Sequence, residues 1–217
     1  MGQSLERNDK ATQILKGAMQ EFLHYGYAGT SMDRVAATAG VSKPTVYSHF
    51  HDKEGLFHAL VKYVAQTRCQ QVMGNETLQG PPAVVLRQVM TKAIDSEVQD
   101  LDYQNFVRLV AGESARFPHL AQAFIEHLTK PAIEELTTYL KTRPELHLAD
   151  PEAMAHILLG STAFYILSQR IMHGHTLLPL DAQRLVDSLV DLVTGSALAT
   201  ASRAMMSCDL PAGDRSG

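Results

Sequence analysis

Apolar residues recur at spacings of three and four along almost the whole chain, and the two-residue alternation of strands is scarce. This periodicity is typical of amphipathic helices, each of which buries one face. The sequence therefore predicts an all-α protein built from nine helices. These are expected over about residues 8–25, 32–39, 43–50, 53–73, 82–94, 101–116, 119–141, 151–174 and 182–204.

Residues with strong preferences for helix ends mark several of these boundaries. Gly26 follows the first helix and can take the left-handed conformation that stops a helix. Ser42 can cap the third helix, and Asp150 followed by Pro151 is a strong start signal for the eighth. Pro131 falls inside the periodic pattern of the seventh helix and predicts a kink or a short break there.

Composition and charge narrow the class of protein. The 217 residues are 45% hydrophobic and 19% charged, with 19 Lys and Arg against 23 Asp and Glu, so the net charge is −4. This balance argues against coating nucleic acid by bulk charge but leaves a local basic face open. Cys69 and Cys208 lie far apart without metal-ligand spacing, and neither a signal peptide nor a membrane span is visible. We therefore expect a reduced, cytoplasmic protein without a metal or a cofactor.

The second and third expected helices form the most specific pattern in the chain. They are short, they are joined by the tight turn Ala39-Gly40-Val41-Ser42, and the small side chain of Ala36 allows a close crossing. Two such helices with a glycine-containing turn are typical of a helix-turn-helix unit. In DNA-binding units of this kind the second helix enters the major groove.

The segment GYAGTSMDRVAATAGVSKPTVYSHFHDKEGLF resembles the N-terminal DNA-binding domain of the TetR family of transcriptional regulators. The matching positions across about residues 10–60 are Gly26, Thr30, Val35, Ala36, Ala39, Gly40, Val41, Ser42, Thr45, Tyr47, Phe50, Lys53 and Leu56. The resemblance implies a helix-turn-helix DNA-binding domain over residues 1–55 and a helical effector-binding and dimerisation domain over residues 56–217. It also implies a two-fold symmetric homodimer on a palindromic DNA operator.

Side chains around the turn offer the chemistry that DNA contact needs. Lys43 can donate to guanine or to phosphate, and Thr45 can pack on a thymine methyl group and form a hydrogen bond. By resemblance, Tyr47 and Lys53 are phosphate anchors. The candidate DNA-binding residues are Thr30, Ser31, Ser42, Lys43, Pro44, Thr45, Tyr47, Ser48, His49 and Lys53. Some also have a purely structural interpretation, because the two serines that precede helices cap them in any case and Tyr47 could be a core aromatic.

The later helices carry the expected effector pocket. The segment FVRLVAGESARFP, followed by HLAQAF, resembles a TetR branch whose members govern efflux or responses to small molecules. Large apolar side chains around Pro131 predict a pocket for an apolar or aromatic effector. The candidate ligand-binding residues are Phe106, Leu109, Val110, Phe124, Leu128, Phe164 and Tyr165. Each of them could also be a plain core residue, and the pocket as a whole is implied by the resemblance.

The eighth and ninth expected helices are the candidate homodimer contact. Gly160 and Ala163 allow another helix to approach closely, and the ninth helix carries Leu189 and Leu192. Pairing both helices with their two-fold mates would give a four-helix bundle.

These observations favour a ligand-responsive transcriptional regulator, a repressor that leaves its operator when the effector binds. The alternative within the family is a constitutive or activating DNA-binding regulator without ligand gating. An enzyme is disfavoured because the sequence offers no paired carboxylates with suitable spacing and no nucleophile–base set. A redox sensor that acts through Cys69 stays open, although a lone cysteine on a helix is usually just packed.

Overall fold

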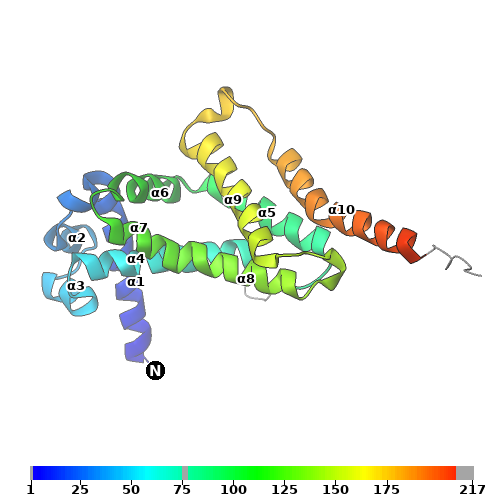
Figure 1. Ribbon diagram of the computed structural model, residues 1–217. Coiled ribbons are helices and arrows are strands. Elements are labelled where there is room, and N and C mark those ends of the chain that lie inside the picture. Colours follow the sequence, from blue (N-terminus) through cyan, green and yellow to red (C-terminus); the bar gives the residue numbers. More distant parts are fainter. Residues whose placement is uncertain (1, 75–77, 209–217) are drawn as a thin grey trace, which may run out of the picture.

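A computed structural model describes the backbone of residues 2–74 and 78–208. Every regular element in these ranges is a helix, which confirms the all-α class (Figure 1). The N-terminal helices are α1 (Gly2–Gly29), α2 (Met32–Thr38), α3 (Lys43–Phe50) and α4 (Lys53–Met73). The later helices are α5 (Pro82–Gln99), α6 (Leu101–Glu113), α7 (Pro118–Phe124), α8 (Lys130–Lys141), α9 (Pro151–Ile166) and α10 (Ala182–Cys208).

The expected helix over residues 119–141 is divided by a π-helical turn. Residues Ile125–Thr129 join α7 to α8, and the N–H of Lys130 donates to the carbonyl of Ile125, one residue further back than in an α-helix. Pro131 has no N–H, and in a regular helix its ring would press against the carbonyl of His127. The wider turn relieves that clash, so the predicted kink takes the form of a π-helical turn just before the proline.

The expected helix over residues 151–174 keeps α-helical geometry only to Ile166. A second π-helical turn, Leu167–Ile171, follows, and the 3-10 turn Gly174–Thr176 then leads towards α10. A glycine is needed in that turn, because a Cβ on Gly174 would lie 2.6 Å from the carbonyl oxygen of Ser168. The connection between α9 and α10 is therefore tightly wound.

The first helix also ends where the sequence predicts. Gly26 has φ 70° and ψ 174°, so regular helical geometry stops at Tyr25 and one further turn follows. The helix begins at Gly2, earlier than the expected start at residue 8.

Two hydrophobic clusters hold the helices together. The first joins α1–α4 to α6 and α7 around fully buried rings such as Phe22, Phe57 and Phe106. The second joins α5, α8, α9 and α10 around Leu86 and Leu158. The helix-turn-helix unit thus shares its core with part of the expected second domain. The division of function after residue 55 remains a prediction, since the packing does not divide there.

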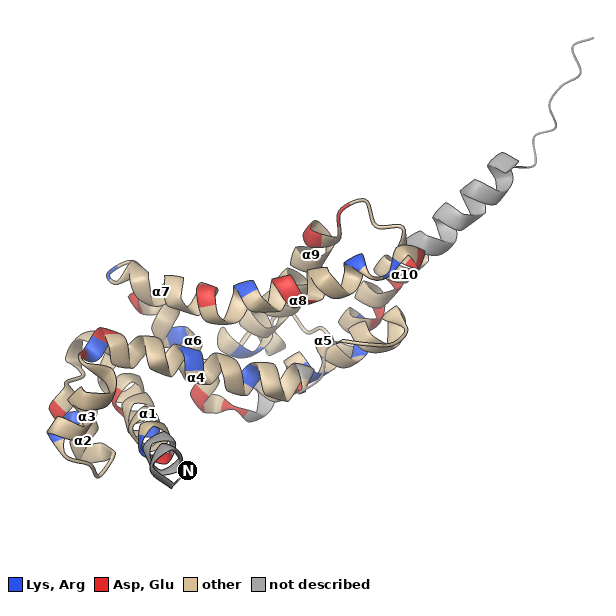
Figure 2. Cartoon of the chain, turned by 90° about the horizontal axis from the view of Figure 1, so that it is seen from below, with Lys and Arg blue, Asp and Glu red and all other residues tan. Residues whose placement is uncertain are grey.

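The clusters follow one another along an elongated molecule. The helices α2 and α3 lie at one end, α4 runs through the middle against α7 and the π-helical turn that follows it, and α10 reaches towards the other end (Figures 1 and 2). Within the described ranges no helix combines the length and the apolarity that crossing a bilayer requires.

Candidate nucleic-acid interface

The turn between α2 and α3 is closed by backbone and side-chain hydrogen bonds. Gly40 has a left-handed φ of 64°, and the N–H of Val41 reaches back to the carbonyl of Ala36 over 3.0 Å. The hydroxyl of Ser42 then accepts from the N–H of Thr45 at 3.3 Å and caps α3. These contacts confirm the predicted helix-turn-helix and the capping role of the serine.

The helix-turn-helix is fixed against α1 at one very close crossing. A Cβ added to Gly17 would lie 2.9 Å from the Cβ of Ala39 and 3.0 Å from its backbone nitrogen. Beside this contact the side-chain amide of Gln13 donates to the carbonyl of Ala39 over 2.7 Å. The position of α1 therefore sets the end of α2 and, through the turn, the direction of α3.

The helix α3 buries one side and presents the other to solvent. Val46 is fully buried, whereas Lys43, Pro44 and Ser48 are exposed and Tyr47 is 41% exposed. Basic and acidic residues are intermixed on α2 and α3 (Figure 2). The outer side of α3 thus combines donors with an aromatic ring but is not a continuous basic face.

Several polar groups of α3 already contact one another. The hydroxyl groups of Ser42 and Thr45 lie 2.7 Å apart, and the hydroxyl of Ser48 donates to the carbonyl of Thr45 over 2.8 Å. His49 is half-buried, with its ring 5.8 Å from that of Phe50. These hydroxyl groups are therefore held in fixed positions along the exposed side of the helix.

Lys43 carries the positive charge at the start of α3. Its ammonium pairs with Asp33 of α2 at 2.7 Å and lies 5.9 Å from the centroid of the Tyr47 ring. The hydrogen bond to Asp33 and its negative charge raise the pKa of Lys43, so the ammonium stays charged at neutral pH. Both partners are exposed, and such pairs are weak enough for another anion to replace the carboxylate.

Two neighbouring candidate DNA-binding residues, Thr30 and Ser31, differ in their exposure to solvent. Thr30 is only 3% exposed, and its hydroxyl lies 2.8 Å from the carbonyl oxygen of Gly26 and 3.0 Å from that of Glu21. Its side chain therefore fastens the end of α1. Ser31 is exposed and caps α2 by accepting from the N–H of Arg34 at 3.3 Å.

Lys53 is bound to the end of α1. Its ammonium donates to the carbonyls of Tyr27, Ala28 and Thr30 over 2.9, 3.3 and 3.1 Å. Burial lowers the pKa of Lys53, and the nearby carboxylate of Glu113 opposes that shift. Three acceptors match the three protons of the ammonium, so contact with phosphate would need at least one of these bonds to be exchanged.

Arg34 is a basic residue that is missing from the candidate DNA-binding residues predicted from the sequence. Its guanidinium lies over the ring of Tyr25, 3.8 Å from the centroid, and one nitrogen donates to the carbonyl of Gly29 at 3.4 Å. Both side chains are exposed beside α2. The sequence does show that Arg34 lies in the first turn after the Ser31 cap, and this position could have indicated a DNA contact. It does not show that the end of α1 holds the Arg34 side chain at the surface.

Five of the predicted effector residues gather in the first hydrophobic cluster. Phe106 and Val110 are buried there, and Leu109, Phe124 and Leu128 pack against it while partly buried. They come from α6, α7 and the π-helical turn that follows. These helices therefore meet next to α4, which carries Phe57 in the same cluster.

The other two predicted effector residues lie elsewhere. Phe164 is 63% exposed on α9, and Tyr165 is buried in the second cluster. Adjacent residues on a helix point about 100° apart, so the two side chains face different surroundings. The expectation that Phe164 lines an interior pocket in the single chain is therefore corrected: it is a surface residue.

Phe164 belongs to an exposed stripe on α9. The stripe consists of Ile157, Gly160 and Phe164 together with Leu167, the first residue of the π-helical turn that follows, and spacings of three and four place them on one side. We call it the α9 face. A face of this kind exposes large apolar side chains around a small residue that allows close approach.

The helix α6 contacts both clusters. The carboxylate of Glu113 accepts from the N–H of Tyr27 at 3.2 Å, at the end of α1. Near its middle, Arg108 donates to the carbonyl of Ile171 over 2.9 Å, in the second π-helical turn. One helix thus connects the DNA-binding end with the connection between α9 and α10.

Two family profiles match the chain. Residues 14–60 are similar to the bacterial regulatory proteins of the tetR family. Residues 84–196, more than half of the chain, are similar to the AefR-like transcriptional repressor C-terminal domain.

Similar proteins of known sequence are regulators of the same kind. The HTH-type transcriptional regulator YhgD of Bacillus subtilis is 23% identical over 188 residues, which cover 83% of this chain and 93% of YhgD. The HTH-type transcriptional activator FasR of Mycolicibacterium smegmatis is 39% identical over 61 residues, 28% of each chain. The chain spans only 37%, 28% and 37% of the lengths of the first three curated relatives it matches.

Solved structures share the fold. Salmonella enterica GusR aligns with a TM-score of 0.67 and 20% identity, over 88% of this chain and 96% of GusR. The flavonoid-responsive regulator FrrA aligns with a TM-score of 0.64 and 25% identity, over 91% and 97%. FadR from Bacillus subtilis, solved in complex with stearoyl-CoA, aligns with a TM-score of 0.63 and 17% identity, over 85% and 98%.

Proposed function

The chain belongs to the TetR family of transcriptional regulators, and we propose that it is a repressor that binds a palindromic operator as a homodimer. Members of this family regulate transcription and are not enzymes. The observation that carries the proposal is the outward side of α3, which is fixed by the Ser42 cap and by the close crossing at Gly17. A rigid helix with exposed donors suits insertion into the major groove.

On DNA, the outer side of α3 would make most of the contacts. Lys43 would exchange Asp33 for a guanine or a phosphate, and Tyr47 would donate its hydroxyl to a phosphate. The remaining proposed contacts from this region are Ser31, Ser42, Pro44, Thr45, Ser48 and His49. Thr30 and Lys53 would act mainly by positioning the end of α1, because their side chains bond to its carbonyls.

The α9 face supports the homodimer part of the proposal. It offers apolar area and the small Gly160 for close packing with a second copy. In two-fold symmetric dimers of this type the recognition helices lie about 34–36 Å apart, one turn of DNA. The operator would then be an inverted repeat with that spacing.

A small apolar or aromatic effector would bind among Phe106, Leu109, Val110, Phe124 and Leu128. FrrA is described as flavonoid-responsive, FadR was solved with stearoyl-CoA, and AibR with isovaleryl coenzyme A and operator DNA. Those ligands belong to those proteins, but they support small-molecule binding by the shared fold. The alternative is a constitutive or activating DNA-binding regulator without ligand gating.

DNA contact is tested by selecting bound duplexes from a random pool and measuring their affinity by fluorescence anisotropy. We expect an inverted repeat to be enriched, and we expect Lys43→Gln and Tyr47→Phe each to weaken binding at least about ten-fold, since each complex loses two charged or polar contacts. Lys62→Gln, an exposed lysine of α4, is the matched control and should bind normally. Equal affinity in the Lys43→Gln, Tyr47→Phe double variant would contradict the proposal.

Gating is tested on the same complex with apolar and aromatic compounds. An effector should lower operator affinity as it saturates the protein. A compound that binds tightly in the first cluster without changing operator affinity would support the ungated alternative instead.

A further inference from the structure

A cavity lies outside the region proposed for the effector. It measures about 460 Å³ and is formed where the end of α9 and the connection that follows meet the start of α10. Its lining residues are Tyr165, Gln169, Arg170, His175, Pro179, Leu180, Asp181 and Arg184. Small-molecule sites typically have volumes of about 300–1,000 Å³, so the space suits a metabolite.

The lining is cationic. Arg170 and Arg184 are permanently charged, and His175 can add a third positive charge. Asp181 is the single acid of the lining, and one of its oxygens already accepts from the backbone N–H of Arg184 at 3.1 Å. Neither arginine has a carboxylate within ion-pair distance among the described residues.

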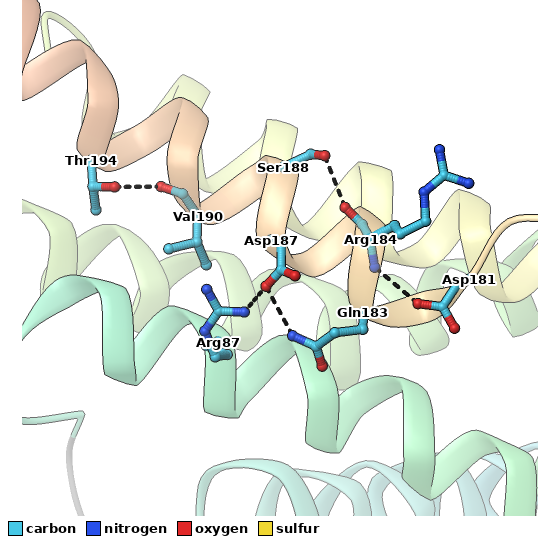
Figure 3. A network of polar contacts seen from close by, with 8 residues as sticks. All are labelled: Arg87, Asp181, Gln183, Arg184, Asp187, Ser188, Val190 and Thr194. Atoms are coloured by element: carbon cyan, nitrogen blue, oxygen red, sulfur yellow. Dashed lines mark hydrogen bonds and ion pairs between the residues drawn. The ribbon is translucent and has the colours of Figure 1, made fainter.

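One guanidinium nitrogen in this lining lacks a hydrogen-bond partner among the described residues. The Nε of Arg170 is buried and has no acceptor within the described part of the chain. A buried donor without an acceptor costs free energy, and an oxyanion in the cavity would supply that acceptor. Figure 3 shows the side chain of Arg184 pointing away from Arg87 and Asp187, which pair α5 with α10 on the other side. Arg184 is therefore not drawn into that ion pair.

The walls of the cavity are held in place. The hydroxyl of Tyr165 donates to the carbonyl of Leu180 over 3.0 Å, and the side-chain amide of Gln169 donates to the carbonyl of Leu178 over 2.6 Å. Next to the lining residue Arg170, Arg108 of α6 holds the π-helical turn by donating to the carbonyl of Ile171. A site whose groups are fixed before binding loses less conformational entropy when a ligand arrives.

We propose that this cavity binds a small oxyanion, a metabolite bearing phosphate or carboxylate groups, with Arg170 and Arg184 as its charged ligands. Arginine forms paired, charge-assisted hydrogen bonds with both kinds of group. Pro179 and Leu180 would cover the uncharged part of the molecule. The site goes beyond the proposed effector pocket, because its charged lining suits anions and because it lies near α10 instead of between α6 and α7.

The proposal is tested by calorimetric titration of the full chain, without DNA, with pyrophosphate and with citrate at constant ionic strength. We expect saturable binding of one anion per chain, and at least a ten-fold loss of affinity in Arg170→Gln and in Arg184→Gln. Lys92→Gln removes one exposed charge from α5 and is the matched control. Preference for pyrophosphate would assign a phosphate compound, and preference for citrate a carboxylic acid.

Two outcomes would overturn the site: no saturable binding of either anion, or unchanged binding in the Arg170→Gln, Arg184→Gln double variant. Arg184 is exposed, so Arg184→Gln decides the question even if the variant at the half-buried Arg170 does not fold. Because no DNA is present, failure here is separate from failure of the operator proposal.

Discussion

At the residue scale, Lys53 has a structural role that its sequence context conceals. Its ammonium bonds to three carbonyls at the end of α1, where no helical N–H is available to them. It also lies 4.7 Å from the centroid of the Tyr27 ring. The residue thereby joins the start of α4 to the end of α1.

We expect Lys53→Met to lower the free energy of unfolding by about 1–2 kcal/mol, because charge-assisted hydrogen bonds to the end of α1 are lost. Urea unfolding of the protein without DNA measures this. Lys62→Met is the control, since Lys62 is exposed on the same helix. If both variants unfolded alike while only Lys53→Met lost operator affinity, Lys53 would be a phosphate ligand and not a structural one.

Cys69 provides a second prediction at this scale. Burial and the nearby carboxylate of Glu135 raise the pKa of the thiol. The thiolate is the reactive form, so a raised pKa leaves less of it at neutral pH. In a Cys208→Ser background, Cys69 should react with a disulfide reagent at pH 7 more slowly than in the unfolded chain.

Glu135→Gln should speed that reaction, because it removes the negative charge that disfavours the thiolate. The rate should also rise with pH above neutrality. Fast modification at pH 7, with a loss of operator affinity that Cys69→Ser prevents, would instead restore the redox-sensor alternative.

At the element scale, the contact between α1 and α2 depends on a missing side chain. Gly17→Ala should lower the free energy of unfolding by about 1–3 kcal/mol, because the new methyl group overlaps Ala39 and forces the helices apart. Thermal unfolding checks this, and operator affinity should fall with it. Gly112→Ala in α6 is the control: its Cβ meets open space, so helix propensity should raise stability by up to about 1 kcal/mol.

The helices and their caps could be predicted because their signals are local. Ser42, Gly40 and Gly26 act on the backbone within a few residues of themselves. The π-helical turns could not be placed, since Pro131 predicts a disturbance but not which hydrogen bonds absorb it. The sequence also could not predict that Phe164 lies on the exposed side of α9, because a helix with apolar residues on all sides has no single inward direction.

For the site, the sequence located the outer side of α3 but not the partners of each charge. Lys43 was expected at the surface and lies there, while its ion pair with Asp33 depends on how α2 crosses α3. Thr30 and Lys53 were expected near phosphate, yet both contact the end of α1. The bonds of Lys53 reach more than twenty residues back along the chain, so they depend on tertiary packing, which periodicity does not encode.

At the scale of the whole molecule, the α9 face predicts where two copies of the chain contact each other. Phe164→Glu places a charge in the middle of that face and should convert the proposed homodimer into a monomer, because burying an unpaired charge is costly. Light scattering during gel filtration measures the mass. Leu101→Glu, at an exposed leucine of α6, should leave the assembly unchanged.

Operator affinity of the Phe164→Glu monomer should also collapse, since one half-site offers few cationic contacts. A Phe164→Glu protein that stays dimeric would place the contact elsewhere on the chain.

The length of α4 has a mechanical consequence. Its 21 residues span about 32 Å at 1.5 Å per residue. If α4 tilts by about 5° about one end, its other end moves by about 3 Å. In a symmetric dimer the two copies of α4 would move apart by about 6 Å, which is nearly two base-pair steps of about 3.4 Å. Phe57 of α4 contacts Phe106 of α6, with ring centroids 5.7 Å apart, so a small movement of α6 would be passed to α4. A shift too small to disturb either hydrophobic cluster would then move both recognition helices out of register with the major grooves.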